Sequence, residues 1–316
     1  MVSTGRFEWF SRETALLLNN IIFVTAAAAV FVGTMYPLVV DALGVGKISV
    51  GRPYFDAMFS LIAIPLLLLL AIGPEIRWKG DQWPRLAKRL SGFFIVSLVV
   101  GLLLPFIFER QLNLATGLGL AGALLVALTT LRDLVARLAR SHRVPSAYLG
   151  MVLAHLGVSF FVVGVTITSS YSEEKDLRME PGASYNISGY EFRFKGTQKI
   201  QGPNYVADEA IIEVWKGNEK SGDLRPQKRV YSGKSNPMTE ASIDKGLFRD
   251  LYAALGEPLN NGAWSMRVYY KPMIRWIWLG CIFMTIGGVL AVSDRRYRQT
   301  LKQKMGFNSE LQASRA

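Results

Sequence analysis

Residues 147–171 read AYLGMVLAHLGVSFFVVGVTITSSY, an apolar run of 25 residues that contains one histidine, His155. At ~1.5 Å per residue, such a run is long enough to cross the ~30 Å hydrocarbon core of a membrane as a helix. An ionisable side chain is costly to place in hydrocarbon, so a histidine at this depth indicates a functional site by default. The run therefore predicts a transmembrane helix and marks His155 as its candidate functional residue.

Five further apolar runs are long enough to span a membrane, and the composition agrees with a membrane protein. Half of the 316 residues are hydrophobic, although the chain carries a formal charge of +12. The lysines and arginines lie in short clusters beside the apolar runs, where orientation signals occur, so the charge does not indicate nucleic-acid binding. The additional runs are 18–40, 54–73, 92–108, 114–134 and 274–293. We therefore expect an all-α polytopic membrane protein of about six transmembrane helices, in contact with lipid.

The basic residues predict which side of the membrane each connection faces. Two connections and the segment after the last run are strongly basic, and with six spans all three fall on the side of the two termini. The basic residues in these segments and just before them are Arg77, Lys79, Arg85, Lys88, Arg89, Arg132, Arg137, Arg140, Arg143, Arg295, Arg296, Arg298, Lys302 and Lys304. By the positive-inside rule, this side is cytoplasmic. We therefore expect a protein of the bacterial inner membrane with both termini cytoplasmic and residues 172–272 in the periplasm.

The long segment between the fifth and sixth spans has the pattern of a β-rich domain. Residues 190–195 alternate aromatic and charged side chains, a period of two that fits a strand with one buried face. Residues 210–215 and 264–270 also predict strands, separated by turns that contain glycine, asparagine and proline. The expected domains are a membrane domain (1–171), a small β-rich periplasmic domain (172–272), the sixth helix (273–293) and a basic cytoplasmic tail (294–316).

One part of this segment predicts a short helix instead. Within residues 243–256, the leucines Leu247, Leu251 and Leu255 recur at every fourth position, which would place them on one face of a helix. We therefore expect a mainly β domain that contains one short helix.

His155 has the surroundings and the chemistry of a haem ligand, but from spacing alone a structural role explains it equally well. Gly150, Ala154 and Gly157 lie around it, and small residues let a neighbouring helix or a flat macrocycle approach the backbone. A neutral imidazole is also a common axial ligand of haem iron. In the alternative interpretation, the imidazole hydrogen-bonds to a neighbouring helix and binds nothing.

The sequence offers no obvious second ligand for a bis-histidine haem. The other histidine, His142, lies in a basic loop and is expected to be solvated. The single cysteine, Cys281, cannot form an internal disulfide or a CxxCH haem attachment site, and is expected to be a small buried hydrophobe. If His155 binds iron, the other ligand is therefore expected to be a methionine or a histidine of another polypeptide.

Other classes of function find little support in the sequence. There are two histidines and neither lies within 172–272, so no Ser-His-Asp triad or zinc cluster can be assembled there. Small-solute permeases favour a pair of interrupted helices with charges inside the membrane, and the sequence shows no such pair. A non-catalytic membrane scaffold that docks partner proteins, with His155 only packing, remains open as the alternative.

Seven sequence blocks then point to a known family. They are SRETALLLNN (11–20), DALGVGKISV (41–50), LAHLG (153–157), GPNY (202–205), MTEASID (238–244), RDLYAALGE (249–257) and YYKPMIRWIW (269–278). In this order they resemble the C-terminal half of the CcmF family, the membrane subunit of the cytochrome c maturation (System I) haem lyase. The resemblance implies attachment of haem to the CxxCH cysteines of apocytochrome c on the periplasmic side. It also implies two partners, a holo-CcmE-type haem chaperone and a CcmH-type protein that presents the apocytochrome.

The resemblance also implies a role for His155. CcmF proteins hold a b-type haem in the membrane, and the histidine of the AHLG block, His155 here, matches one of its two axial ligands. The family's tryptophan-rich WWD segment and the other axial ligand belong to the N-terminal half, and nothing like them occurs in this sequence. We therefore expect haem b as the cofactor, with its second ligand supplied by the N-terminal half. As the product of a split gene or a truncation, the chain is expected to be part of a cytochrome c haem lyase and inactive alone.

Overall fold

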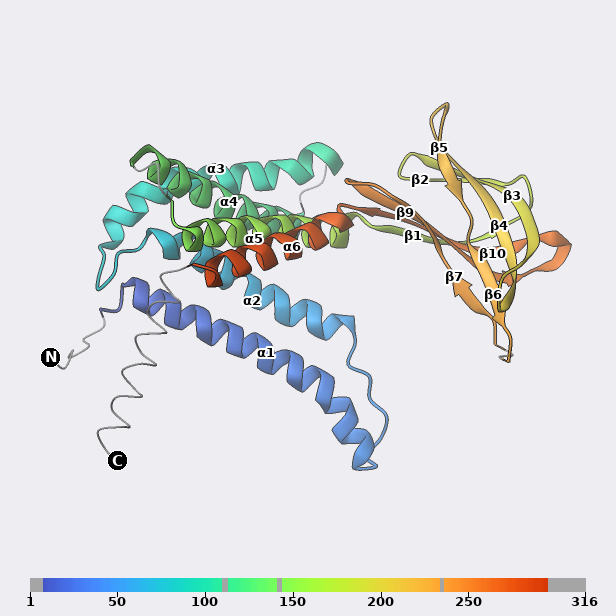
Figure 1. The fold of residues 1–316 in the computed structure, drawn as a ribbon, viewed down its shortest axis with the longest axis horizontal. Coiled ribbons are helices and arrows are strands. Elements are labelled where there is room, and N and C mark those ends of the chain that lie inside the picture. Colours follow the sequence, from blue (N-terminus) through green and yellow to red (C-terminus); the bar gives the residue numbers. More distant parts are fainter. Residues whose placement is uncertain (1–7, 110–112, 141–143, 234–235, 295–316) are drawn as a thin grey trace. The chain divides into compact units, whose positions relative to one another are not determined.

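The helical part of the chain contains six helices that are long and apolar enough to cross a membrane. The computed structural model describes residues 8–109, 113–140, 144–233 and 236–294. The six helices in these residues are α1 (Arg12–Ala42), α2 (Arg52–Ile72), α3 (Trp83–Glu109), α4 (Leu114–Arg140), α5 (Ser146–Tyr171) and α6 (Ile274–Val292) (Figure 1). The six predicted spans are therefore confirmed. Helix α3 begins at Trp83 and not at Gly92, because polar and basic residues continue the helix beyond its apolar part.

Helix α4 is the most buried member of the helical unit. Half of its most apolar stretch is buried, against 6% for α1. Val126 of α4 is fully buried and packs with Leu67 and Ala71 of α2. Val158 and Val162 of α5 pack against the same cluster. Helix α5 therefore has one face directed toward α2 and α4.

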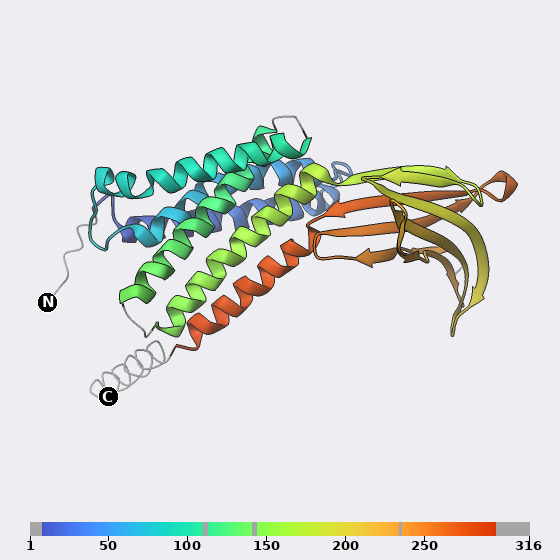
Figure 2. The same cartoon turned by 90° about the horizontal axis from the view of Figure 1, so that it is seen from above.

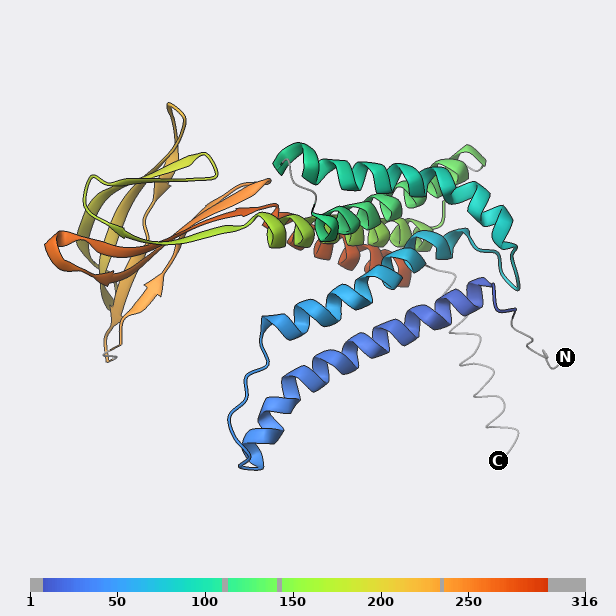
Figure 3. The same cartoon turned by 180° about the vertical axis from the view of Figure 1, so that it is seen from behind.

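Helix α1 lies beside α2 (Figure 3). The Tyr54 hydroxyl donates a hydrogen bond of 2.9 Å to the carbonyl oxygen of Ala29, and the Tyr54 ring fills the space in front of Gly33. Most of the remaining apolar surface of α1 is exposed. Within a membrane, this surface faces lipid or another polypeptide.

Two antiparallel sheets that share one core follow helix α5, inside the compact unit Val163–Leu279 (Figure 1). The strands are β1 (Glu173–Met179), β2 (Ser184–Ile187), β3 (Tyr190–Gln201), β4 (Tyr205–Lys216), β5 (Glu219–Leu224), β6 (Gln227–Tyr231), β7 (Met238–Glu240), β8 (Ser242–Lys245), β9 (Arg249–Pro258) and β10 (Trp264–Pro272). One sheet has the order β1-β10-β9-β8, and the other β2-β3-β4-β6-β7 with β5 paired to β4. Phe192 and Phe194 of one sheet meet Leu251 and Leu255 of the other, and all four are fully buried.

The three predicted strands are confirmed, but the predicted short helix is wrong. Residues 243–256 form most of β8, a turn and most of β9, in which Ser242 pairs with Ala253 and Lys245 with Asp250. A spacing of four residues is also a multiple of two, so it fits a strand as well as a helix. Leu251 and Leu255 are fully buried, whereas Leu247 lies in the turn with 57% of its surface exposed.

This difference between the leucines gives a testable prediction. Replacing Leu251 with alanine is expected to lower the free energy of unfolding by about 2–5 kcal/mol, because it leaves a cavity between the sheets. Leu247→Ala, the matched control in the turn, is expected to change it by less than about 0.5 kcal/mol. Denaturant unfolding followed by tryptophan fluorescence measures both. Equal losses in the two variants would contradict the strand assignment.

Polar contacts join the base of the β domain to the helices that enter and leave it. The Thr168 hydroxyl of α5 donates to the carbonyl oxygen of Pro272 at 2.7 Å. Arg275, in the first turn of α6, donates to the Asp250 carboxylate of β9 at 3.2 Å. The last turn of α5 and the first turn of α6 therefore belong to the same unit as the sheets.

Candidate functional site

The His155 side chain lies ~13 Å along α5 from its first residue, at ~1.5 Å per residue. Its Nδ1 atom is 2.9 Å from the carbonyl oxygen of Met151, one turn earlier. A carbonyl only accepts, so Nδ1 carries the proton and donates it in this hydrogen bond. The neutral ring then has a lone pair on Nε2. This is the tautomer in which a histidine ligates a metal while its other nitrogen donates to a nearby acceptor such as a main-chain carbonyl.

The small residues near His155 face helix α6. A Cβ atom added to Gly150 would lie 2.4 Å from the carbonyl oxygen of Gly287, and one added to Gly157 would lie 2.8 Å from that of Gly280. Figure 2 shows α5 and α6 side by side. Of the two explanations that the sequence leaves open for Gly150 and Gly157, the structure supports the close approach of a helix. A flat macrocycle would therefore have to lie on another face of α5.

His155 points away from this glycine face. It lies three residues before Val158 and seven before Val162, so the three side chains share the face that packs toward α2 and α4. The imidazole is only partly buried by the described residues. Ser159, one turn further on, is buried and donates to the main-chain oxygen of His155 at 3.3 Å, which leaves the ring free. Nε2 is thus the atom of His155 available to a ligand.

The described residues place no cluster of metal-binding side chains around His155. Among the residues that the structure describes, no group of three or more His, Cys, Asp or Glu side chains could hold a metal ion. His142 lies outside the described residues. Cys281, on α6, has a free thiol and is partly exposed rather than fully buried as expected. His155 therefore fits one ligand position of a haem iron, and the described residues do not form a metal site of three or more His, Cys, Asp or Glu side chains.

A second polar cluster was missed at the sequence level. Glu75, in the short 3₁₀ helix Gly73–Glu75 after α2, is buried and forms ion pairs with Arg89 and Arg132. In the sequence, these arginines indicate only the membrane orientation of the chain. A carboxylate that directly follows an apolar span and precedes a basic cluster is the signal that could have revealed it.

The comparisons with known proteins identify the family. Residues 170–272 match the family model described as "CcmF C-terminal beta-sandwich". The cytochrome c-type biogenesis protein CcmF of Escherichia coli (strain K12) is 43% identical over 290 residues, which cover 92% of this chain. The chain corresponds to the C-terminal region of the CcmF family. The CcmF protein of Haemophilus influenzae is 42% identical over 309 residues and 94% of the chain.

A solved structure supports the CcmF fold. The chain named "Cytochrome c Heme Lyase CcmF" superposes with a TM-score of 0.72 over 91% of this chain, at 21% identity. At this identity the similarity shows the fold alone, six long apolar helices with a β-sandwich. The chain spans about half the length of these proteins: 45% and 47% of the two CcmF relatives, and 47% of the solved chain.

Proposed function

We propose that this chain is the C-terminal part of a cytochrome c haem lyase and supplies His155 Nε2 as one axial ligand of a membrane haem b. The observation that carries the proposal is the hydrogen bond from His155 Nδ1 to the Met151 carbonyl oxygen, which leaves Nε2 unprotonated inside an apolar helix. The similar proteins support the setting, since they are named as cytochrome c-type biogenesis proteins and as a cytochrome c haem lyase.

The role of the chain in this function is to hold and orient. Met151 fixes the tautomer and the plane of the His155 ring, so Nε2 would be able to hold haem iron without a prior proton transfer. Val158 and Val162, on the same face, keep water away from this side of α5 and lower the local dielectric, a factor that tunes redox potential. When bound, haem b supplies one-electron chemistry that would keep the iron of the substrate haem ferrous while its vinyl groups react with apocytochrome c thiols.

We also propose the membrane orientation that the basic residues predict. Two contacts support placing the start of α1 and the end of α6 on the same side of the membrane as the basic connections. The main-chain nitrogen of Arg12, at the start of α1, donates to the carbonyl oxygen of Arg77 after α2. Asp294, after α6, accepts a bond of 3.0 Å from the main-chain nitrogen of Ala147 in α5. The basic side would be cytoplasmic, with both termini, and the β-sandwich periplasmic.

Our proposal includes the domain division and the partners. Residues 1–171 and 273–293 would form the membrane domain, 172–272 the periplasmic domain and 294–316 a cytoplasmic tail. The second haem ligand would come from the N-terminal half of the lyase. The periplasmic domain would work with CcmH-type and holo-CcmE-type proteins on apocytochrome c.

The haem spectra of the chain alone and of the chain with the N-terminal region of CcmF test whether each part supplies one haem ligand. The chain expressed alone is expected to show no stable bis-histidine haem spectrum, because the described residues supply one imidazole. The chain expressed together with the N-terminal region of CcmF is expected to purify with a low-spin haem b spectrum and to restore cytochrome c in cells that lack CcmF.

Two outcomes would contradict the proposal. A bis-histidine haem in the chain alone would show that it is self-sufficient. A co-purified complex that restores cytochrome c without any haem b would instead favour a docking scaffold, in which His155 only packs.

A further inference from the structure

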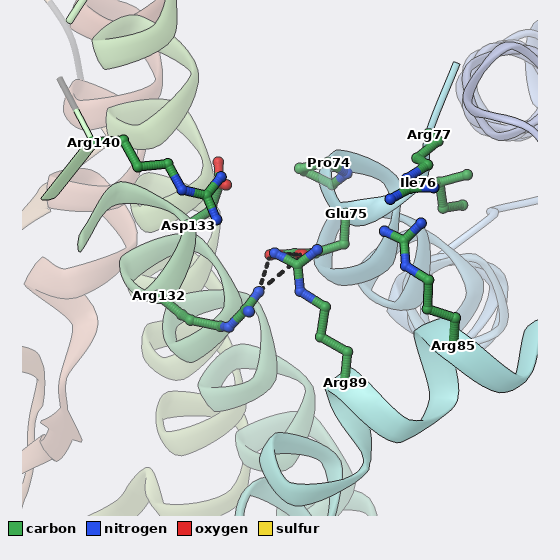
Figure 4. Close-up of a pocket in the computed structure, with 9 residues that line it drawn as sticks. All are labelled: Pro74, Glu75, Ile76, Arg77, Arg85, Arg89, Arg132, Asp133 and Arg140. Atoms are coloured by element: carbon green, nitrogen blue, oxygen red, sulfur yellow. Dashed lines mark hydrogen bonds and ion pairs between the residues drawn. The ribbon is translucent and has the colours of Figure 1, made fainter. Parts of the chain in front are cut away.

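A basic pocket of about 420 Å³ lies where helix α2 ends, α3 begins and α4 ends. Its lining is mostly charged (Figure 4), and comprises Pro74, Glu75, Ile76, Arg77, Arg85, Arg89, Arg132, Asp133 and Arg140. Five arginines thus face two carboxylates. Even when Asp81, which pairs with Arg85, is counted, the surroundings keep an excess of two positive charges. The pocket therefore has the electrostatic character of an anion site.

The carboxylate of Glu75 is the internal counter-ion of this pocket, but it serves only two of the arginines. Arg132 Nη1 lies 3.0 Å from both Glu75 oxygens, and Arg89 Nη2 lies 2.8 Å from Oε2. These pairs fix the two guanidinium groups on α3 and α4 in front of the 3₁₀ helix (Figure 4). Asp133 is engaged elsewhere, since it accepts a bond of 2.7 Å from the Tyr148 hydroxyl. Arg77, Arg85 and Arg140 are not neutralised by Glu75.

Two guanidinium nitrogens in the pocket have no hydrogen-bond acceptor. Arg85 Nη1 and Arg89 Nε are both buried, and neither has a hydrogen-bond partner among the described residues. Arg85 Nη1 makes only a 3.3 Å ion pair with Asp81. Leaving a buried charged donor unsatisfied is costly, and native structures rarely do so without a bound water, ion or ligand. The two donors therefore indicate an acceptor-rich ligand from outside the described residues.

We propose that this pocket binds the phosphate group of an anionic ligand. Guanidinium groups match phosphate oxygens with paired hydrogen bonds, and several arginines around one concave site are the arrangement used to hold a phosphate. The site lies at the ends of three spans, which is where lipid phosphates occur, and basic pockets between such helices bind anionic headgroups. An anionic phospholipid and a soluble phosphate present the same chemistry. The inference does not involve His155.

A titration of the purified protein tests the proposal and separates the two sources. The probes are dihexanoyl phosphatidylglycerol, dihexanoyl phosphatidylcholine and inorganic phosphate. Binding is measured as the rise in unfolding temperature with ligand concentration, because a ligand of the native state stabilises it. Phosphatidylglycerol is expected to bind, whereas phosphatidylcholine should bind at least about tenfold more weakly, since the arginines repel its choline group. Inorganic phosphate that binds as tightly as phosphatidylglycerol would assign the site to a soluble ligand, and weaker binding would assign it to lipid.

Removing a positive charge from the pocket and removing a negative one are expected to change phosphatidylglycerol binding in opposite directions. Arg85→Gln is expected to weaken phosphatidylglycerol binding about tenfold, by removing an unsatisfied charged donor. Asp133→Asn is expected to strengthen it, since the amide oxygen can still accept from Tyr148 while a negative charge is lost. Arg52→Gln is the matched control, because Arg52 begins α2 at the other end of that helix and pairs only with exposed Asp56.

Two results would overturn the proposal. One is that Arg85→Gln binds phosphatidylglycerol as tightly as Arg52→Gln does. The other is that all three probes fail to stabilise the unmodified protein. Should Arg85→Gln not fold, Arg77→Gln replaces it, since the Arg77 side chain also lines the pocket.

Discussion

Replacing His155 with alanine is expected to remove haem b from the proposed complex between this chain and the N-terminal region of CcmF. Nε2 of His155 is the metal-competent atom on this face of α5, because Met151 already holds Nδ1. Changes in the groups that hydrogen-bond to a metal ligand lower metal affinity ~10–100-fold, and loss of the ligand itself should lower it further. The absorption of the purified complex measures haem content, and the yield of cytochrome c in cells measures function. We expect both to fall at least about tenfold.

A matched variant separates ligation from packing at this position. Leu156→Ala removes a side chain of similar size from the next residue of the same helix, but no metal-binding atom. It is expected to keep the haem spectrum. Added imidazole is expected to restore a low-spin spectrum to His155→Ala, since it replaces the lost nitrogen in the vacated space. If His155→Ala has the same haem content and cytochrome c yield as Leu156→Ala, the ligand assignment is wrong. The result would then favour the interpretation of the chain as a docking scaffold.

The sequence predicts the elements of this fold well because their signals are local. Each membrane helix is an apolar run of the required length, and the run 147–171 coincides with α5 to within one residue. Over much of their length, strands β3 and β4 alternate buried side chains with partly exposed ones. The wrong prediction of a helix at 243–256 also comes from a local signal, because leucine at every fourth residue fits both the period of a helix and the period of a strand. Only the pairing of β8 with β9 decides between them.

The candidate sites are less predictable because their partners are distant in the chain. His155 is conspicuous in its apolar helix, but its sequence spacing does not reveal that α6 occupies the glycine face and leaves the imidazole on another. Glu75 meets Arg132, 57 residues later, and Arg89 on a different helix. No periodicity within one element reports such a contact. Arginines that indicate membrane orientation in the sequence can therefore also belong to a polar cluster that the sequence does not reveal.

Replacing Gly287 with leucine is expected to separate α5 from α6 and destabilise the helical unit. A Cβ atom at this position would lie 2.5 Å from the carbonyl oxygen of Gly150 and 2.8 Å from the main-chain nitrogen of Ala154. Backbone atoms cannot move aside as a flexible side chain can, so the helices must part. Overpacking of this kind costs about 1–3 kcal/mol or more. Thermal unfolding of the protein in detergent measures the loss, and we expect haem content to fall with it, since α5 carries His155.

The adjacent residue provides the control for this prediction. Gly288 follows Gly287 on α6 and is exposed, and nothing lies within 4 Å of a Cβ atom added to it. The same substitution, Gly288→Leu, is expected to leave stability unchanged or raise it by up to ~1 kcal/mol, because leucine has a higher helix propensity than glycine. Equal destabilisation of the two variants would show that glycine itself matters for α6, for instance as a flexible point. A loss confined to Gly287→Leu requires that the two helices touch through their backbones, which is the contact that turns the His155 face of α5 away from α6.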